Sequence, residues 1–147
     1  MQIVQTKTGI LYVGRAPTTP YELIDHQFNI IWNLAAEYAD LKDIEANFSD
    51  RVLLGNIEDY GVPEDVELFT AQLKEVVDCL RNNGSAFVHC AAGCGRTGMV
   101  LACIMHCVNG LSIKSSLAIA KKICNGPENE KQIKFIEQRK WLSTTLP

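Results

Sequence analysis

Apolar residues form short runs in the N-terminal half of the chain, and polar or turn-forming residues separate these runs. Such runs predict short strands, because an extended segment needs only a few apolar residues to cross a core. The predicted strands lie at residues 3–4, 10–13, 30–34, 51–54 and 85–89. The first two, separated by Thr8 and Gly9, are typical of a strand pair at a sheet edge.

Apolar residues recur at helical spacing from Val66 to Leu80, which predicts an amphipathic helix. Pro63 fits the first position of that helix, and Glu64 and Asp65 complement the positive end of its dipole. Five further helices follow from spacing and capping residues. They cover residues 20–26 after a capping Thr19, 36–50 at the surface, 99–109 up to Gly110, 113–125 between a capping Ser112 and Gly126-Pro127, and 128–143.

Strands alternate with helices early in the chain, and helices dominate its later part. This order predicts an α/β fold with a central sheet flanked by helices. The chain has 147 residues, of which 47% are hydrophobic, and it contains no repeat or linker. We therefore expect one domain over residues 1–147 with one core.

The composition and charge of the chain disfavour some classes of binding partner. The net charge is −3, and the lysines and arginines are scattered without a basic block, which disfavours a nucleic-acid or membrane surface. No apolar stretch is long enough to span a membrane, and the N-terminus lacks the core of a signal peptide. Six cysteines in such a chain are expected to be free thiols of a cytoplasmic protein.

The segment from His89 to Gly98 carries the most specific chemistry of the chain. It links a buried strand to a buried helix through a glycine-rich turn. Backbone N–H groups and the positive end of a helix dipole then meet in one small volume, which is a natural anion site. Cys90 at its start and Arg96 at its end favour a thiolate, because a helix N-terminus and a guanidinium both stabilise negative sulfur. A thiolate below an anion site suggests attack on phosphate.

This segment resembles the signature loop of the cysteine-based protein tyrosine and dual-specificity phosphatases. The matching positions are His89, Cys90, Gly93, Gly95, Arg96, Thr97 and Gly98. The resemblance implies an α/β domain with a sheet of about five strands, mostly parallel, and the loop at the carboxyl end of one strand. The short chain lacks a tyrosine-containing recognition segment before the sheet, and this absence points to the compact, atypical dual-specificity group.

Each of the main residues of the loop has its own expected role in the reaction. Attack by Cys90 would give a phosphocysteine intermediate, and the planar fork of Arg96 can hold two phosphate oxygens at once. The resemblance implies that Thr97 donates its hydroxyl to the cysteine sulfur and that a buried His89 supports the loop. The phosphate-binding positions are Ala91, Ala92, Gly93, Cys94, Gly95 and Arg96.

The leaving group needs a proton, so a carboxylic acid is expected near Cys90. In small members of the resembled family this aspartate lies on a loop about thirty residues before the cysteine. Asp59 precedes Cys90 by 31 residues and lies in a turn-rich stretch. It is our candidate for the general acid and, in the second step, the base that activates water. Its rivals are Glu58, Glu64 and Asp65, of which the last two also fit a helix N-terminus.

Several other polar residues have two interpretations. Cys94 is either a peroxide-sensing partner of Cys90 or a small apolar filler, and we favour the filler. Residues that could ligate a metal occur at Cys103, His106 and Cys107, but we favour a packed helix face and expect no metal and no cofactor. Cys79 and Cys124 fit the same description of helix-face fillers.

Asn129 and Gln132 lie where some members of the resembled family place a glutamine that orients the hydrolytic water. We favour a polar helix face for both residues.

The predicted function is hydrolysis of phosphotyrosine, and of phosphoserine and phosphothreonine, on protein substrates by a monomeric enzyme. Loop positions 91, 92 and 94 lack the lysines that lipid phosphatases of the superfamily often carry, which disfavours a phosphoinositide substrate. The acidic balance disfavours an RNA 5′-phosphatase. A non-catalytic phosphopeptide-binding module would be expected to have lost the cysteine, the arginine or the acid. A cysteine protease would need a histidine partner that the sequence does not place.

Overall fold

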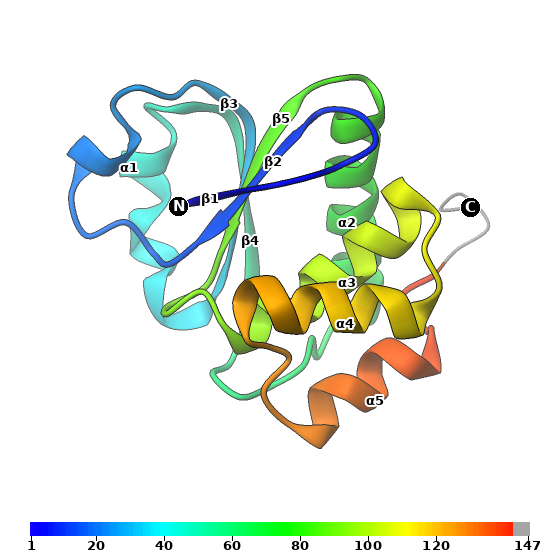
Figure 1. The fold of residues 1–147 in the computed structure, drawn as a ribbon. Helices are drawn as coiled ribbons and strands as arrows, with labels where there is room; N and C mark the ends of the chain where they lie inside the picture. The colour runs from blue at the N-terminus through cyan, green and yellow to red at the C-terminus, as the bar shows by residue number, and fades with distance from the viewer. Residues whose placement is uncertain (143–147) are drawn as a thin grey trace.

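A computed structural model describes residues 1–142 of the chain, and its strands form a single twisted sheet (Figure 1). Within these residues the sheet has five strands in the order β1-β2-β5-β3-β4. The strands are β1 (Gln2–Val4), β2 (Ile10–Gly14), β3 (Phe28–Ala35), β4 (Ser49–Ile57) and β5 (Ser85–His89). β1 runs antiparallel to β2, and every other neighbouring pair is parallel. The predicted mostly parallel α/β sheet is confirmed.

Helices cover both faces of the sheet unequally. Figure 1 shows the four long helices on one side and the short helical turns on the other. The long helices are α2 (Val66–Arg81), α3 (Gly95–Asn109), α4 (Ile113–Cys124) and α5 (Glu130–Gln138). The short elements are the 3-10 turns η1 (Pro20–Leu23) and η2 (Ala36–Leu41) and the helix α1 (Lys42–Glu45).

Strand β5 lies at the centre of the sheet, between β2 and β3. Its side chains alternate between the two faces, as the two-residue period of a strand requires. Ala86 and Val88 join the large core under the long helices, and Phe87 joins a smaller cluster with Leu23 and Phe28 on the other face. Helix α3, which follows β5, is buried along almost its whole length. The loop between these two elements is therefore held at both ends by the core.

The predicted start of the long helix at Pro63 is wrong. Helix α2 begins at Val66, and Asp65 is its N-cap, with a side chain that accepts a hydrogen bond from the Leu68 N–H at 3.0 Å. The aspartate side chain satisfies a free N–H of the first turn, as an N-cap residue does. This cap moves the helix start to the residue after Asp65.

Other boundaries differ from the predictions as well. The strands predicted at 30–34 and 51–54 extend to β3 and β4, because parallel pairing with a neighbour continues past the apolar run. The single surface helix expected at 36–50 is instead η2 followed by α1, and its Glu45 is fully buried. The last helix, expected over 128–143, ends at Gln138, where Arg139 turns the chain with a φ of 59°. Residue 143 of that prediction, and residues 143–147 of the predicted domain, lie outside the described residues.

The capping residues of the later helices agree with the sequence. Gly110 ends α3 in the left-handed conformation, with a φ of 68°. Ser112 caps α4 by accepting a hydrogen bond from the Ser115 N–H at 3.1 Å. Among residues 1–142, no helix is long and apolar enough to cross a membrane.

The N-cap of α2 gives a direct test of the corrected boundary. We expect Asp65→Ala to lower the free energy of unfolding by about 1 kcal/mol, because the Leu68 N–H loses its acceptor. The matched control is Glu64→Ala, one residue earlier and exposed, which should change stability by about 0.5 kcal/mol or less. Urea unfolding of both variants measures the difference, and equal losses would place the cap elsewhere.

Candidate active site

The loop over residues 90–94 connects β5 to α3 and closes tightly against the neighbouring strand β2. Gly93 has a φ of 79°, and a Cβ at this position would lie 2.7 Å from the carbonyl carbon of Gly14. Only glycine fits this combination of left-handed backbone and close approach. The Ala16 N–H donates to the Ala91 carbonyl at 3.0 Å, which fixes the other side of the loop.

Cys90 lies at the bottom of the loop, with 3% of its surface exposed. The hydroxyl of Thr97, in the first turn of α3, donates a hydrogen bond to the Cys90 sulfur at 3.0 Å. Thr97 is not the N-cap of this helix, a position that Cys94 occupies. The first turn of α3 therefore holds a hydrogen-bond donor against the Cys90 sulfur.

Arg96 is buried, and its guanidinium is surrounded by acceptors from three segments. Nη1 donates to Glu37 Oε1 at 2.6 Å and to the Ile57 carbonyl at 2.8 Å. Nη2 donates to Glu37 Oε2 at 2.7 Å, so Glu37 binds the arginine through both oxygens. Asp59 Oδ1 lies 3.4 Å from Nη2.

These contacts leave one edge of the guanidinium available. A guanidinium has five N–H donors, of which Glu37 and the Ile57 carbonyl accept three. The remaining two, on Nε and Nη2, lie along one edge and can bind two oxygens of a tetrahedral anion side by side. Asp59 lies next to this edge, so an anion bound there would also lie near its carboxylate.

The ion pair between Glu37 and Arg96 shifts the pKa of both groups. Hydrogen bonding from Arg96 holds the pKa of Glu37 below its ordinary value of 4.5, against the opposing effect of partial burial. Burial by itself lowers the pKa of Arg96, but Glu37, with smaller contributions from Cys90 and Asp59, raises it overall. The guanidinium therefore stays charged in its buried position.

His89 is fully buried beneath the loop and belongs to a hydrogen-bonded network. Its Nδ1 lies 3.1 Å from the Cys90 carbonyl, and its Nε2 lies 2.6 Å from Glu45 Oε2. Because a carbonyl only accepts, Nδ1 carries a proton, and Nε2 and Glu45 share another. The amide of Asn33 donates to the Tyr38 carbonyl at 2.8 Å and lies 3.5 Å from Glu45 Oε1, which links this network to η2.

The four carboxylates weighed as the acid lie in different places. Asp59 alone among them forms an ion pair with Arg96 in the described residues, and it is 55% exposed. Glu58 and Glu64 are exposed, and Asp65 is occupied as the cap of α2. Of the four candidate acids, Asp59 is therefore the one that the structure places beside Arg96.

The remaining cysteines are inside or near the core. Burial raises the pKa of Cys107 to about 11 and that of Cys124 to about 12, so both are neutral thiols. Cys103 is fully buried, and the ring of His106 contacts the Leu111 carbonyl and the Trp141 ring. These contacts agree with the packed helix face that we favoured. Within residues 1–142, no group of three or more His, Cys, Asp or Glu side chains could hold a metal ion.

Cys94 is half-buried, and its thiol lies 3.8 Å from the Ala92 carbonyl, its hydrogen-bond acceptor. Cys79 is half-buried on α2, and burial also raises the pKa of its thiol.

The interpretation of Asn129 and Gln132 as a polar helix face is wrong. Gln132 is fully buried, and Asn129 is the N-cap of α5. Both side chains contact the backbone of residues 60–61, directly after Asp59. The polar character of the two residues suggested an exposed face, but their partners lie about seventy residues earlier in the chain.

Sequence reasoning missed Glu37 and Glu45, the two carboxylates beneath and beside the loop. Both lie in a stretch rich in acidic residues, which is typical of a solvated surface. The available signal was the presence of Arg96 and His89 in a buried segment, since buried polar side chains require hydrogen-bond partners, here from another segment. That signal indicates that partners exist, but it does not say which acidic residues they are.

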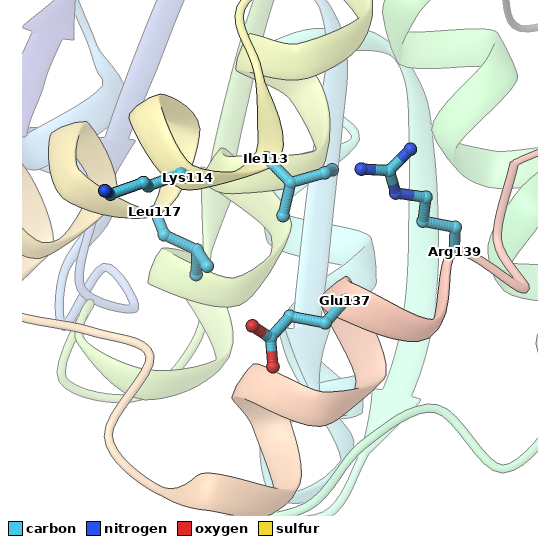
Figure 2. Close-up of a pocket in the computed structure, with 5 residues that line it drawn as sticks. All are labelled: Ile113, Lys114, Leu117, Glu137 and Arg139. Carbon is cyan, nitrogen blue, oxygen red and sulfur yellow. The ribbon is translucent and has the colours of Figure 1, made fainter.

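Two hollows in the surface differ in their relation to the loop. One, of about 630 Å³, adjoins Ala91 and Ala92 and is lined on its other sides by residues 15–18 and by Tyr38, Asp40 and Leu41. The other, of about 490 Å³, lies between α4 and α5 (Figure 2). Its lining residues, Ile113, Lys114, Leu117, Glu137 and Arg139, are all outside the loop. Of these two hollows, the first adjoins the loop and can receive part of a ligand bound there.

Comparison with known proteins identifies the family and the fold of this chain. The family described as "Polymorphic toxin system, DSP-PTPase phosphatase" matches residues 12–110, which is more than half of the chain. A tyrosine phosphatase homologue, 067L of Invertebrate iridescent virus 3, is 37% identical over 68 residues. That alignment covers 44% of this chain but only 28% of the viral protein.

Solved structures share the fold. Tk-PTP in its active form superposes with a TM-score of 0.73 at 23% identity, over 89% of this chain and 90% of that one. Human DUSP28 superposes with a TM-score of 0.69 at 15% identity, over 88% and 89% of the two chains. The chain belongs to the DSP-PTPase phosphatase family, whose model it matches over residues 12–110.

The Glu37–Arg96 pair predicts a pH dependence of stability. Because the pKa of Glu37 is lowered on folding, the pair stabilises the folded state above the ordinary pKa of 4.5, and this contribution is lost as the pH falls through the lower folded value. We expect Glu37→Gln to be less stable than the parent protein near neutral pH, and the gap to shrink as the pH falls below 4.5.

Urea unfolding between neutral pH and pH values below 4.5 measures the difference in the free energy of unfolding between the two proteins. Glu64→Gln, an exposed carboxylate that lies outside the ion pairs of the described residues, is the control and should show no such gap. A gap for Glu37→Gln that stays constant with pH would contradict the assigned ion pair.

Proposed function

We propose that this enzyme hydrolyses phosphate monoesters of protein tyrosine, serine and threonine residues through a phosphocysteine intermediate on Cys90. Arg96 and the backbone N–H groups of residues 91–96 bind the phosphate. Asp59 protonates the leaving oxygen and then activates the water that releases phosphate. The contact between Asp59 and the buried Arg96, at 3.4 Å, carries this proposal, because it puts an acid beside the anion site.

The first step transfers the phosphoryl group to sulfur. The Cys90 thiolate attacks phosphorus, a P–S bond forms, and the P–O bond to the side chain breaks. The leaving oxygen takes its proton from Asp59, which must be protonated at this stage. The free edge of Arg96 binds two of the equatorial oxygens, where negative charge is shared in the transition state.

The second step returns the enzyme to its starting state. Asp59, now a carboxylate, removes a proton from water, and the resulting attack on phosphorus breaks the P–S bond. The hydrogen bond from Thr97 to the Cys90 sulfur, at 3.0 Å, stabilises the departing thiolate. His89 holds the loop from below and does not transfer a proton to substrate.

The hollow beside Ala91 and Ala92 supports a protein substrate. Its lining includes the apolar residues Ala16, Pro17 and Leu41. Arg15, the basic side chain of this lining, is paired with Glu22 at 3.0 Å, and Asp40 adds a negative charge. Such a surface suits a peptide flanking one phosphorylated residue better than a headgroup or RNA end with several phosphates.

Replacing the nucleophile tests the mechanism. We expect Cys90→Ser to lower kcat for p-nitrophenyl phosphate by at least about a thousandfold, because a serine hydroxyl is not ionised in this loop. Binding of phosphotyrosine peptide to the variant should survive. The control Cys79→Ser, a half-buried thiol on α2, should keep full activity. Turnover retained by Cys90→Ser would refute the phosphocysteine route.

Replacing the acid separates Asp59 from its rivals. We expect Asp59→Asn to lower kcat by about a hundredfold for phenyl phosphate, a poor leaving group, and much less for p-nitrophenyl phosphate. Glu58→Gln, its exposed neighbour, should behave like the parent enzyme. If Glu58→Gln shows the selective loss instead, the acid is Glu58. A panel of phosphotyrosine, phosphothreonine and phosphoinositide substrates then tests the substrate class.

A further inference from the structure

The first turn of α5 holds the backbone that follows Asp59. The Asn129 amide nitrogen donates to the Tyr60 carbonyl at 2.9 Å, and the Gln132 amide nitrogen donates to the Gly61 carbonyl at 3.2 Å. These carbonyls belong to the two residues immediately after Asp59. The contacts join segments about seventy residues apart in sequence.

The oxygen of each side-chain amide accepts a hydrogen bond from a backbone N–H within residues 128–132. Asn129 Oδ1 accepts from the Gln132 N–H at 2.9 Å, which is the N-cap of the helix. Gln132 Oε1 accepts from the Glu128 N–H at 2.9 Å. Because each amide oxygen has a fixed donor, each NH₂ group can only point toward residues 60–61. Gln132 is fully buried, so its side chain has little freedom to move.

The loop that accepts these hydrogen bonds is exposed, and its backbone conformation at Tyr60 is unfavourable. Asp59 is 55% exposed, and Tyr60 adopts a φ of 61°, a left-handed conformation that residues with a side chain rarely adopt. Its local support is a turn in which the Gly61 N–H donates to the Glu58 carbonyl at 2.9 Å. The two bonds from α5 therefore stabilise the conformation in which Asp59 faces Arg96.

We propose that Asn129 and Gln132 are positioning residues for the general acid, a proposal that rests on the role given to Asp59 above. The two amides bind the carbonyls of Tyr60 and Gly61, and we call this pair of hydrogen bonds the clamp. The clamp keeps the Asp59 carboxyl at the leaving oxygen. They touch neither Cys90 nor Arg96 through the contacts described. Their loss weakens proton delivery to the leaving group and leaves attack by the thiolate intact.

Two substitutions at Asn129 separate the clamp from the helix cap. Asn129→Asp and Asn129→Ser both keep an oxygen that caps α5, and both remove the amide NH₂ group that reaches the Tyr60 carbonyl. The first adds a negative charge and the second does not, so an effect common to both is not due to charge. Equal melting temperatures for the parent and the variants show that the cap and the fold persist.

The readout is the dependence of kcat on the leaving group. We expect both variants to lose about tenfold in kcat for phenyl phosphate and less than about twofold for p-nitrophenyl phosphate, because only the poor leaving group needs the acid. Glu130→Gln, an exposed neighbour in the first turn of α5, is the matched control and should resemble the parent enzyme with both substrates. A purely structural role would lower both rates equally.

Measuring Asp59→Asn in parallel separates failure of this proposal from failure of the proposed function. If Asp59→Asn shows the selective loss but both Asn129 variants match the parent enzyme, the clamp is refuted and the acid stands. Equal losses for the two substrates in the Asn129 variants also refute the clamp. If Asp59→Asn shows no selective loss, the acid assignment fails and the clamp fails with it.

Discussion

The buried charge of Arg96 is the constraint on which the site depends. Burying a guanidinium is costly unless acceptors surround it, so the fold must deliver them from elsewhere in the chain. Glu37 supplies two from η2, the end of β4 supplies the Ile57 carbonyl, and Asp59 lies at the remaining edge. The length of β4 and the turn at η2 therefore matter to the chemistry as much as the loop does.

The two sides of the loop differ in burial. Below it, His89 and Glu45 form a fully buried pair whose network reaches η2 through Asn33. Above it, Asp59 belongs to an exposed segment anchored by two side chains of α5. Cys90 is therefore buried, whereas the carboxyl of Asp59 is exposed at the surface above it, where a substrate can reach it.

The sequence predicts the elements that depend on local pattern. The strand at 85–89 and the end of the apolar helix at Gly110 are found as expected, because spacing and capping alone specify them, whereas α3 begins at Gly95, four residues before the predicted start at 99. Residues that act through distant partners were not predictable. Glu37, Glu45 and Gln132 resemble surface residues, and only the folded chain brings them to Arg96, His89 and Gly61.

The central claim is that phosphate passes through the sulfur of Cys90, and trapping the intermediate tests it most directly. The enzyme is mixed with p-nitrophenyl phosphate, quenched in acid within milliseconds and digested for mass spectrometry. The account predicts a mass increase of about 80 Da on the peptide that contains Cys90, and none in Cys90→Ser. A phosphoryl group on another residue, or turnover with no phosphoenzyme at any quench time, would contradict it.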